Sequence, residues 1–440
     1  MQNRLFDRVA LSAALCFALP LYAAEPQISV AVREQFMAVA GNAQVKRALE
    51  FLKEDDARTL AEQKEIVAIP APPFKEQVRA QNYMKRMAAL GYKDARIDKE
   101  GNVIAVRRGV GSGPALVVSA HLDTVFPEGT DLTVKEKDGR LYAPGIGDDT
   151  RGLAELLSMM RALNETGIKT VGDIWFVGTV GEEGLGDLRG ARALFRENAN
   201  LDGFISIDGP QPARITYLAV GSHRYRVTYK GPGGHSFAAF GRPSAIHALG
   251  RAIAKIGDLK TPMDPKTTFT VGTVRGGTSV NAIAGEATME LDMRSVAMKP
   301  LLELEGAALQ AIKDAAAEEN ARWSTDKITV DIKLVGDRPA GVQPVDAPII
   351  QAAVLAVQEI GLKPVLEEPA STDSNVAISL GIPAMTLGRG GINRDNHSIN
   401  ESWEAKDAYR GPQKNLLAAL ALVGVEGTSK PILQKRPTRQ

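Results

Sequence analysis

The chain has 440 residues and a mass of 47.0 kDa, which is long enough for two or three domains. Hydrophobic residues make up 44% of it and charged residues 24%, so the composition excludes a disordered chain, a fibre and a disulfide-stapled miniprotein. The 53 Lys and Arg residues nearly balance the 52 Asp and Glu residues, and a net charge of +1 gives no reason to expect nucleic acid or an anionic membrane as a partner.

Residues 1–24 have the layout of a secretory signal peptide. Arg4 and Arg8 form a short basic region, an apolar run covers residues 9–21, and Ala24 ends a pair of small residues suited to cleavage. We therefore expect an exported protein, periplasmic or secreted, with an uncleaved membrane anchor as the alternative.

Cysteine and histidine are scarce in this sequence. The only cysteine, Cys16, falls inside the expected signal peptide, so the mature chain would form no disulfide and no thiolate metal site. Any metal ion would then be held by imidazoles and carboxylates. The five histidines are His121, His223, His235, His247 and His397.

Residues 25–218 and 341–427 are predicted to be two parts of one α/β domain, because buried strands alternate with amphipathic helices there. The expected helices cover residues 45–67, 75–90, 151–165, 188–197, 347–360 and 406–424. The expected strands cover residues 103–107, 114–120, 174–180, 204–207, 363–367 and 383–388. The tail, residues 428–440, is expected to be frayed.

Residues 219–340 lie between these two parts and follow a different pattern. The region 214–229 is either a strand pair or one long bent strand. The elements that follow are a helix over 244–257, strands over 267–274 and 285–293, a helix over 300–319 and a strand over 327–334. The order β-α-β-β-α-β is that of a ferredoxin-like α+β domain, here predicted to be inserted into the first domain.

Five acidic or histidine motifs follow predicted strands or begin a helix. Open α/β sheets place their sites at the C-terminal ends of strands. The central residues of the motifs are His121, Asp148, Glu183, Asp208 and His397. Taken singly, each has an ordinary structural interpretation as a strand-end histidine, a helix-capping aspartate, an exposed turn or a surface loop.

Together these five residues supply two imidazoles and three carboxylates. If Asp148 bridges two ions, each ion receives three protein ligands and shares a water, which is the arrangement for hydrolysis at a two-metal site. Nitrogen and oxygen ligands with an open position favour Zn²⁺, without excluding Co²⁺ or Mn²⁺. Asp123 follows His121 by two residues in extended chain, so it could accept a hydrogen bond that fixes the imidazole.

The ordered motifs resemble those of one family over roughly residues 65–425. The family is the dizinc metallopeptidase family that contains carboxypeptidase G, tripeptide aminopeptidase, succinyl-diaminopimelate desuccinylase and aminoacylase. The motifs that carry the resemblance are His121-Leu-Asp-Thr-Val, Gly147-Asp-Asp, Gly181-Glu-Glu-Gly, Ser206-Ile-Asp-Gly and Asn396-His. The resemblance implies a catalytic α/β domain interrupted by a ferredoxin-like lid, which is often the dimerisation domain.

The resemblance also implies how the metal ligands are divided. His121 and Asp208 would hold one ion, Glu183 and His397 would hold the other, and Asp148 would bridge the two. The peptide bond after Asp148 is expected to be cis.

Further roles are implied by the same resemblance. Glu182 would be the general base that takes a proton from the bridging water, and Asp123 would orient a metal-binding imidazole. His235 resembles the lid histidine that stabilises the oxyanion, often from the partner subunit. Asn281 and Arg294 resemble residues that grip the carboxylate of the substrate.

The leading hypothesis is an exported dizinc metallo-exopeptidase that acts on short peptides or N-acyl amino acids. An amidase that releases the acyl group from N-acyl amino acids is the alternative. A non-catalytic exported binding protein with a relict site is the third candidate, which the presence of all five ligand positions and the base disfavours. The resemblance also implies a homodimer formed through the lid domain. We expect no nucleic acid as a partner.

Overall fold

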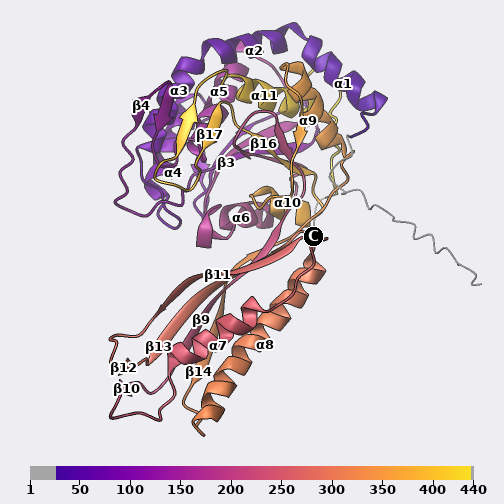
Figure 1. The fold of residues 1–440 in the computed structure, drawn as a ribbon. Helices are drawn as coiled ribbons and strands as arrows, with labels where there is room; N and C mark the ends of the chain where they lie inside the picture. Colours follow the sequence, from indigo (N-terminus) through magenta and orange to yellow (C-terminus); the bar gives the residue numbers. More distant parts are fainter. Residues whose placement is uncertain (1–25, 438–440) are drawn as a thin grey trace, which may run out of the picture.

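The computed structural model describes residues 26–437 of the chain (Figure 1). The predicted signal peptide, residues 1–24, lies outside the described residues. Within residues 26–437, no helix is both long enough and apolar enough to cross a lipid bilayer.

An eight-stranded mixed sheet forms the centre of the larger body. Its strands are β1 (Arg96–Ile97), β2 (Val103–Arg107), β3 (Ala115–His121), β6 (Asp173–Thr179), β7 (Gly203–Gly209), β8 (Arg214–Thr216), β15 (Val365–Leu366) and β16 (Ala384–Gly388). They are arranged in the order β1-β2-β6-β3-β7-β16-β8-β15. The neighbours β6, β3, β7 and β16 are parallel, whereas β2 runs antiparallel to β1 and β6, and β8 runs antiparallel to β16 but parallel to β15. The C-terminal ends of four adjacent strands therefore meet at one edge of the sheet.

Helices cover both faces of this sheet (Figure 1). The apolar core on one face is built with α1 (Val30–Gly41), α2 (Ala43–Glu54), α3 (Asp56–Val67), α4 (Gln77–Ala89), α5 (Thr150–Thr166), α9 (Pro348–Glu359) and α11 (Arg410–Val423). The core on the other face is built with α6 (Arg189–Glu197) and α10 (Ser374–Ser379). Because both faces are covered, every residue of β3 is buried, as its run of apolar residues predicts. The expected large α/β sheet is confirmed.

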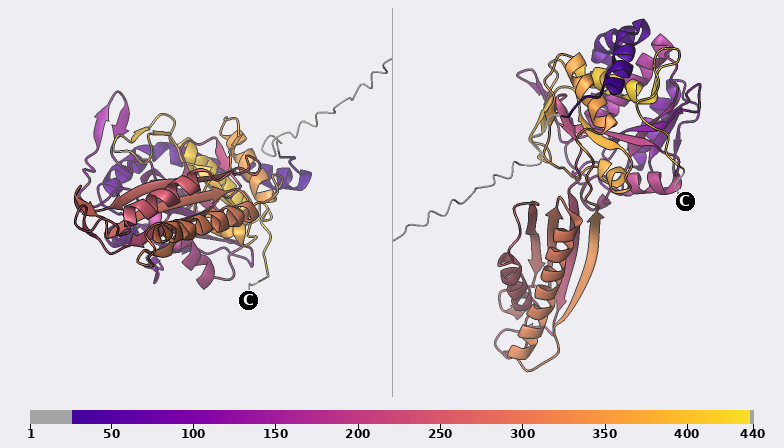
Figure 2. Two further views of the ribbon diagram at one scale, coloured as in Figure 1. Left: turned by 60° about the horizontal axis from the view of Figure 1, so that its bottom comes forward. Right: turned by 90° about the vertical axis from the view of Figure 1, so that its right-hand side faces the viewer.

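Residues 221–338 form a second sheet with its own apolar core. Its strands are β9 (Gly221–Lys230), β11 (Thr267–Gly276), β13 (Glu286–Ser295) and β14 (Thr329–Arg338), in the antiparallel order β11-β13-β9-β14. The helices α7 (Ala245–Gly257) and α8 (Met298–Arg322) cover one face, and Figure 2 shows this body extending from one side of the larger one. A short pair of strands, β10 (Gly234–His235) and β12 (Ala282–Ile283), lies at its far tip. The region 214–229 thus divides into two strands, β8 and β9, that belong to different sheets.

A third, small sheet was not predicted. It consists of β4 (Lys135–Lys137), β5 (Arg140–Tyr142), β17 (Ile392–Arg394) and β18 (Ser402–Glu404), in the order β17-β18-β5-β4. This sheet brings residues 143–149 next to Glu401, whose carboxylate accepts hydrogen bonds from the backbone N–H groups of Gly145, Gly147 and Asp148 at 2.8–3.0 Å. It thereby holds the loop that carries the predicted bridging carboxylate.

The structure differs from the expectations in one helix boundary and in the tail. The helical stretch over 45–67 is two helices, α2 and α3, separated at Asp55, whose carboxylate contacts Arg161 of α5 at 2.6 Å. The tail is docked rather than frayed up to residue 437. Ile432 and Leu433 are buried, and their N–H groups donate to backbone oxygens of α11. Burial of these two apolar side chains holds the tail against the larger body, although basic residues surround them.

A buried charge network lies beneath the site, between α5 and α11. Glu155 accepts hydrogen bonds from Arg151 Nε at 2.9 Å and from Asn415 Nδ2 at 3.1 Å. Burial raises the pKa of Glu155, and burial lowers the pKa of neighbouring Lys414 to about 7.

Replacing Glu155 with Ala should destabilise the fold strongly, because it leaves a fully buried guanidinium without its buried partner. We expect the free energy of unfolding to fall by about 3–5 kcal/mol, measured by urea denaturation. The exposed Glu303→Ala change on α8 is the control and should cost less than about 0.5 kcal/mol. Equal effects of the two changes would contradict this role.

Candidate active site

The predicted site residues lie at the edge where parallel strands end. His121 is the last residue of β3, and Asp208 is the next-to-last residue of β7. Glu182 and Glu183 follow shortly after β6. Because β6, β3 and β7 are adjacent and parallel, these side chains converge above the sheet. Asp148 joins them from the loop before α5, and its peptide bond to the next residue is cis, as the resemblance implied.

The carboxylate of Asp148 lies between two imidazoles. Its Oδ1 is 3.1 Å from Nε2 of His121, and its Oδ2 is 3.4 Å from Nε2 of His397. Oδ1 of Asp208 is 3.8 Å from the first of these nitrogens, and Oε1 of Glu183 is 2.8 Å from the second. All five predicted ligands are therefore together. We call His121, Asp208 and Oδ1 of Asp148 the first half-site, and His397, Glu183 and Oδ2 of Asp148 the second half-site.

The spacing of these atoms suits divalent cations. Nitrogen and oxygen ligands bound tetrahedrally to one zinc ion stand about 3.4 Å apart, and the distances within the two half-sites are 2.8–3.8 Å. The charges agree with the geometry, because four buried carboxylates and one partly buried carboxylate, that of Asp208, face two buried guanidinium groups among the described residues. These groups are Asp148, Asp149, Glu182, Glu183, Asp208, Arg338 and Arg389. The donor set thus fits two divalent ions.

Crowding of charge shifts the pKa values within the cluster. Hydrogen bonds to Asp148 and Glu183 raise the pKa of His397 to about 10. Burial raises the pKa of Asp149 to about 7 and that of Asp208 well above its usual value, with the charge of Asp148 adding to both effects. Shifts of this kind mark a site where burial and closely spaced charges act on the same groups.

Asp123 acts differently from what the sequence predicts. Its carboxylate is 3.7 Å from Nδ1 of His121, whereas its backbone oxygen is only 2.9 Å from that nitrogen. A backbone oxygen can only accept, so Nδ1 carries a proton and Nε2 is the atom available to a metal ion. The carboxylate of Asp123 instead accepts hydrogen bonds from the backbone N–H groups of Glu182 at 3.0 Å and Glu183 at 2.8 Å. The backbone at 123 orients the imidazole, and the side chain fixes the turn that holds both glutamates.

A cavity of about 210 Å³ opens beside the predicted ligands. It is lined by Asp148, Glu182, Glu183, Gly184, Asp208, Arg224, Arg294, Arg338, Ser371 and His397. Glu182, the predicted base, is buried, and burial raises its pKa well above the usual value. Nη1 of Arg338 lies 3.3 Å from Oε1 of Glu182. The predicted base therefore faces the same space as the predicted ligands.

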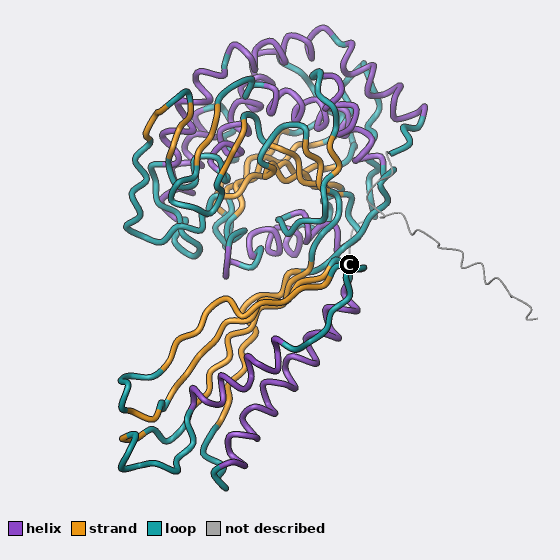
Figure 3. The backbone as a smooth tube through the Cα atoms, viewed as in Figure 1, coloured by secondary structure: helices purple, strands orange, loops and turns teal. Residues whose placement is uncertain are grey.

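The arginines of this cavity come from the second sheet. In Figure 3 the four long strands run from the larger body to the far tip. Arg224 lies near the start of β9, and Arg294 and Arg338 lie at the ends of β13 and β14, where all three line the cavity. Nε of Arg224 and Nε of Arg294 both donate to Asp292, at 2.9 and 2.7 Å. Arg294 therefore lines the site as predicted, while the other two arginines were not predicted.

His235 and Asn281 are not near the predicted ligands of their own chain. They lie at the far tip of the second sheet, on and beside β10 and β12 (Figure 1), where both are exposed. The backbone N–H of Ser236 donates to the backbone oxygen of Asn281 at 2.9 Å, so the two segments are held together. Neither residue lines the cavity of its own chain in this structure.

Two polar contacts at the cluster were not predicted from the sequence. Nη1 of Arg389 lies 2.9 Å from Oδ1 of Asp148, and Nδ2 of Asn396 donates to its Oδ2 at 3.0 Å. Arg389 directly follows the buried strand β16, which ends at the same sheet edge as β7. That position was the signal in the sequence, because a charged residue after an apolar strand points to the functional edge of the sheet.

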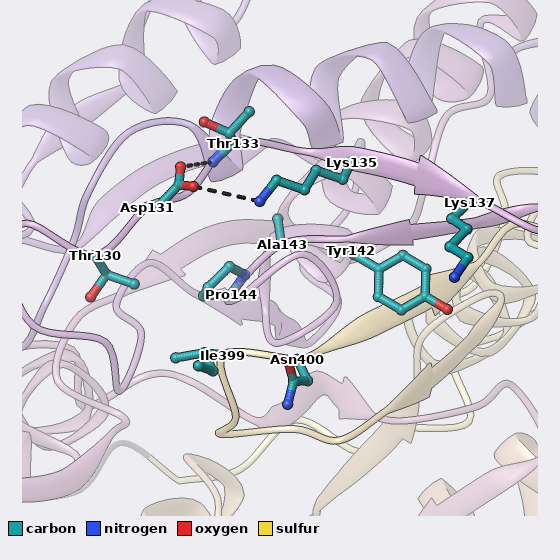
Figure 4. Close-up of a pocket in the computed structure, with 10 residues that line it drawn as sticks. All are labelled: Thr130, Asp131, Thr133, Lys135, Lys137, Tyr142, Ala143, Pro144, Ile399 and Asn400. Atoms are coloured by element: carbon teal, nitrogen blue, oxygen red, sulfur yellow. Dashed lines mark hydrogen bonds and ion pairs between the residues drawn. The ribbon is translucent and has the colours of Figure 1, made fainter.

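A larger cavity of about 750 Å³ lies outside this cluster, between residues 130–144 and the segment Ile399–Asn400 (Figure 4). The one carboxylate that lines it, that of Asp131, is exposed and accepts a hydrogen bond from the backbone N–H of Thr133 at 2.9 Å. No imidazole lines it. The groups suited to hydrolysis are therefore at the smaller cavity.

Comparisons with known proteins agree with this geometry. Residues 117–420 match peptidase family M20/M25/M40. The chain is 30% identical over 259 residues to an acetylornithine deacetylase of Myxococcus xanthus, which spans 54% of this chain and 66% of that protein. It is 25% identical over 371 residues to a succinyl-diaminopimelate desuccinylase of Leptothrix cholodnii, which spans 76% and 92%.

Solved structures share the fold. A tripeptidase of Staphylococcus aureus superposes with a TM-score of 0.68 at 24% identity, over 82% of this chain and 97% of that one. A dinuclear metal-binding peptidase of Bacillus subtilis, from the M20 family, has a TM-score of 0.58 at 18% identity, over 84% and 99%. Because the family match covers more than half of the chain, the protein belongs to peptidase family M20/M25/M40 and is a metallohydrolase that acts on amide bonds.

Proposed function

We propose that the protein is an exported dizinc exopeptidase that removes residues from short peptides. The observation that carries the proposal is the position of Asp148, whose two oxygens face His121 and His397, with Glu182 lining the cavity beside them. The arrangement suits a pair of ion sites that share Asp148.

The chain's own residues divide the work as follows. Two divalent ions, held by His121, Asp208, Glu183 and His397 and bridged by Asp148, would polarise the scissile carbonyl and lower the pKa of the attacking water. Glu182 takes the proton of that water and passes it to the leaving amine. Two contacts hold Glu182 in place. Arg338 contacts the side chain of Glu182, and the carboxylate of Asp123 accepts a hydrogen bond from the backbone N–H of Glu182.

The size and charge of the cavity support a short substrate with a carboxylate. A space of about 210 Å³ admits a substrate of a few residues rather than a folded chain. Arg224 and Arg294 share the single carboxylate of Asp292 through their Nε atoms. Nη1 of Arg224 donates to the backbone oxygen of Gly184. Its Nη2 and the outer nitrogens of Arg294 are suited to a carboxylate of the substrate, which would place the scissile bond near a chain end.

Amide hydrolysis of N-acyl amino acids is the second candidate. The sequence similarity to a deacetylase and a desuccinylase favours it. The test is turnover by the purified mature protein on dipeptides, tripeptides, N-acyl amino acids and folyl-type glutamates, with Zn²⁺ and with a chelator. Zinc-dependent release of amino acids from peptides supports the exopeptidase, and release of acyl groups alone supports the amidase. No turnover of any substrate by protein with two bound ions would contradict both.

We also propose that the second sheet is a lid that forms a homodimer and supplies His235 and Asn281 to the partner's site. Their exposure, far from the ligands of their own chain, supports this arrangement. Large apolar side chains close to them are exposed as well, with Phe237 at 89% and Phe240 at 80%. Exposed aromatic residues at such a tip suit a contact between subunits.

Mixing two inactive variants tests this arrangement. In a mixture of Glu182→Gln and His235→Ala protomers, half of the dimers are mixed, and each mixed dimer contains one intact site. We therefore expect recovery of about a quarter of wild-type activity after subunit exchange. Glu182→Gln mixed with Asp208→Ala is the control and should stay inactive, because both residues act within one chain. No recovery in the first mixture would contradict the proposal.

Export of the chain rests on residues 1–24 alone. The proposal predicts that protein recovered from the periplasm or medium begins close to residue 25, as read by N-terminal sequencing. A full-length chain that stays with the membrane fraction would contradict it.

A further inference from the structure

Arg389 places a positive charge on the ligand atoms of the first half-site. Its side chain is buried, and its Nη1 lies 2.9 Å from Oδ1 of Asp148 and 3.6 Å from Oδ1 of Asp208. These are the same two oxygens that lie near Nε2 of His121, at 3.1 and 3.8 Å. A guanidinium therefore shares two of the three atoms that would bind an ion there.

The guanidinium is tied to this position. Its Nε donates to the backbone oxygen of Gly209 at 3.2 Å, and its Nη1 also contacts Oδ1 of Asp149 at 2.9 Å. Gly209 is the neighbour of Asp208, so the arginine is attached to the strand end that carries a ligand. Because the side chain is buried, its charge has no path into solvent and stays near an ion in the first half-site.

The second half-site has a different neighbour. There the contact on Oδ2 of Asp148, besides His397, is the neutral side-chain amide of Asn396 at 3.0 Å. The two half-sites share a bridging carboxylate but differ in charge. Only the first has a fixed cation on its ligand oxygens within the described part of the chain.

We propose that Arg389 is the counter-ion of the first half-site and weakens ion binding there. Without an ion, Nη1 balances Asp148 and Asp208. When an ion binds, these oxygens turn to the ion and no longer pair with Nη1. The positive charge of Arg389 stays a few ångströms from the ion, and its repulsion weakens the binding of a divalent cation. This inference rests on the proposed dinuclear centre. Its consequence is that the centre fills in two steps of unequal affinity.

The first half-site can be isolated by replacing His397 with Ala, since that side chain is 54% exposed and the change should be tolerated. The metal-free variant is titrated with Co²⁺ and followed by visible absorption and calorimetry. Adding Arg389→Gln should tighten Co²⁺ binding by about tenfold or more, because the opposing charge is removed. Arg389→Met is a second neutral variant and should act in the same direction.

Two controls separate charge from packing. Arg389→Lys keeps the charge and should leave Co²⁺ affinity close to that of the His397→Ala protein. Arg338→Gln removes another buried arginine, one that contacts Glu182 instead of the ligands, and should also leave it unchanged. In thermal melts, the metal-free protein with both His397→Ala and Arg389→Gln should have a lower Tm than the His397→Ala protein. Adding Co²⁺ should raise its Tm by more.

The outcomes are distinguishable. Unchanged or weaker Co²⁺ binding in both neutral variants would overturn the role of Arg389, even if the wild-type protein binds two ions. A wild-type protein that binds no Co²⁺ would contradict the dinuclear centre itself, and this inference with it.

Discussion

Replacing Glu182 with Gln should abolish turnover while both ions remain bound. The amide keeps the size of the carboxylate and can still contact Arg338, but it cannot take a proton from the attacking water. General base catalysis contributes about 10²–10⁴-fold to such reactions, so we expect kcat to fall by about 10³-fold or more. Steady-state kinetics and metal analysis on the same sample measure the two quantities.

The matching control is Glu128→Gln, which removes an exposed carboxylate and should leave kcat and metal content unchanged. Glu183→Gln is the informative contrast, because Glu183 faces His397 in the second half-site. It should lose ion binding as well as turnover. If Glu182→Gln retained more than about a tenth of the wild-type kcat, its assignment as the base would be wrong.

Replacing Asp148 with Asn should remove both ions at once. One oxygen of Asp148 faces each half-site, so no other single residue of the cluster serves both. Asparagine offers one neutral oxygen and an NH₂ group that cannot bind a metal ion. We expect the affinity for Zn²⁺ to fall by about 100-fold or more in both steps, with no measurable turnover.

Metal content after dialysis and calorimetric titration with Zn²⁺ test this expectation. Asp131→Asn changes an exposed carboxylate away from the cluster and should keep two ions per chain. Two ions of unchanged affinity in Asp148→Asn protein would show that Asp148 is not the bridge.

Most of the large sheet could be predicted from the sequence. Runs of buried apolar residues such as 114–120 and 383–388 form strands because helices cover both faces. The small sheet escaped prediction, since its strands have only three residues each and carry polar side chains. Helix α1 was missed for another reason: it buries Val32 and Phe36, but apolar residues such as Met37 also lie on its exposed side, which obscures the helical pattern.

The ligands were predictable and their surroundings were not. His121, Asp208 and Glu183 follow strands whose ends converge, and that can be read from chain order. The contact of Arg389 with Asp148 joins residues 241 positions apart and depends on how β16 pairs with β7. Sequence spacing also fails to predict some contacts between near neighbours. Asp123 was expected to contact the imidazole of His121 through its carboxylate, but its backbone oxygen makes the contact.

The most direct measurement is anomalous X-ray diffraction at the zinc edge, from crystals of the mature protein grown with Zn²⁺. The account predicts two anomalous peaks in each chain, one beside Nε2 of His121 and one beside Nε2 of His397. Each should lie within about 2.3 Å of a different oxygen of Asp148. A single peak, or two peaks that do not share Asp148, would contradict the bridged dinuclear site on which the proposed function depends.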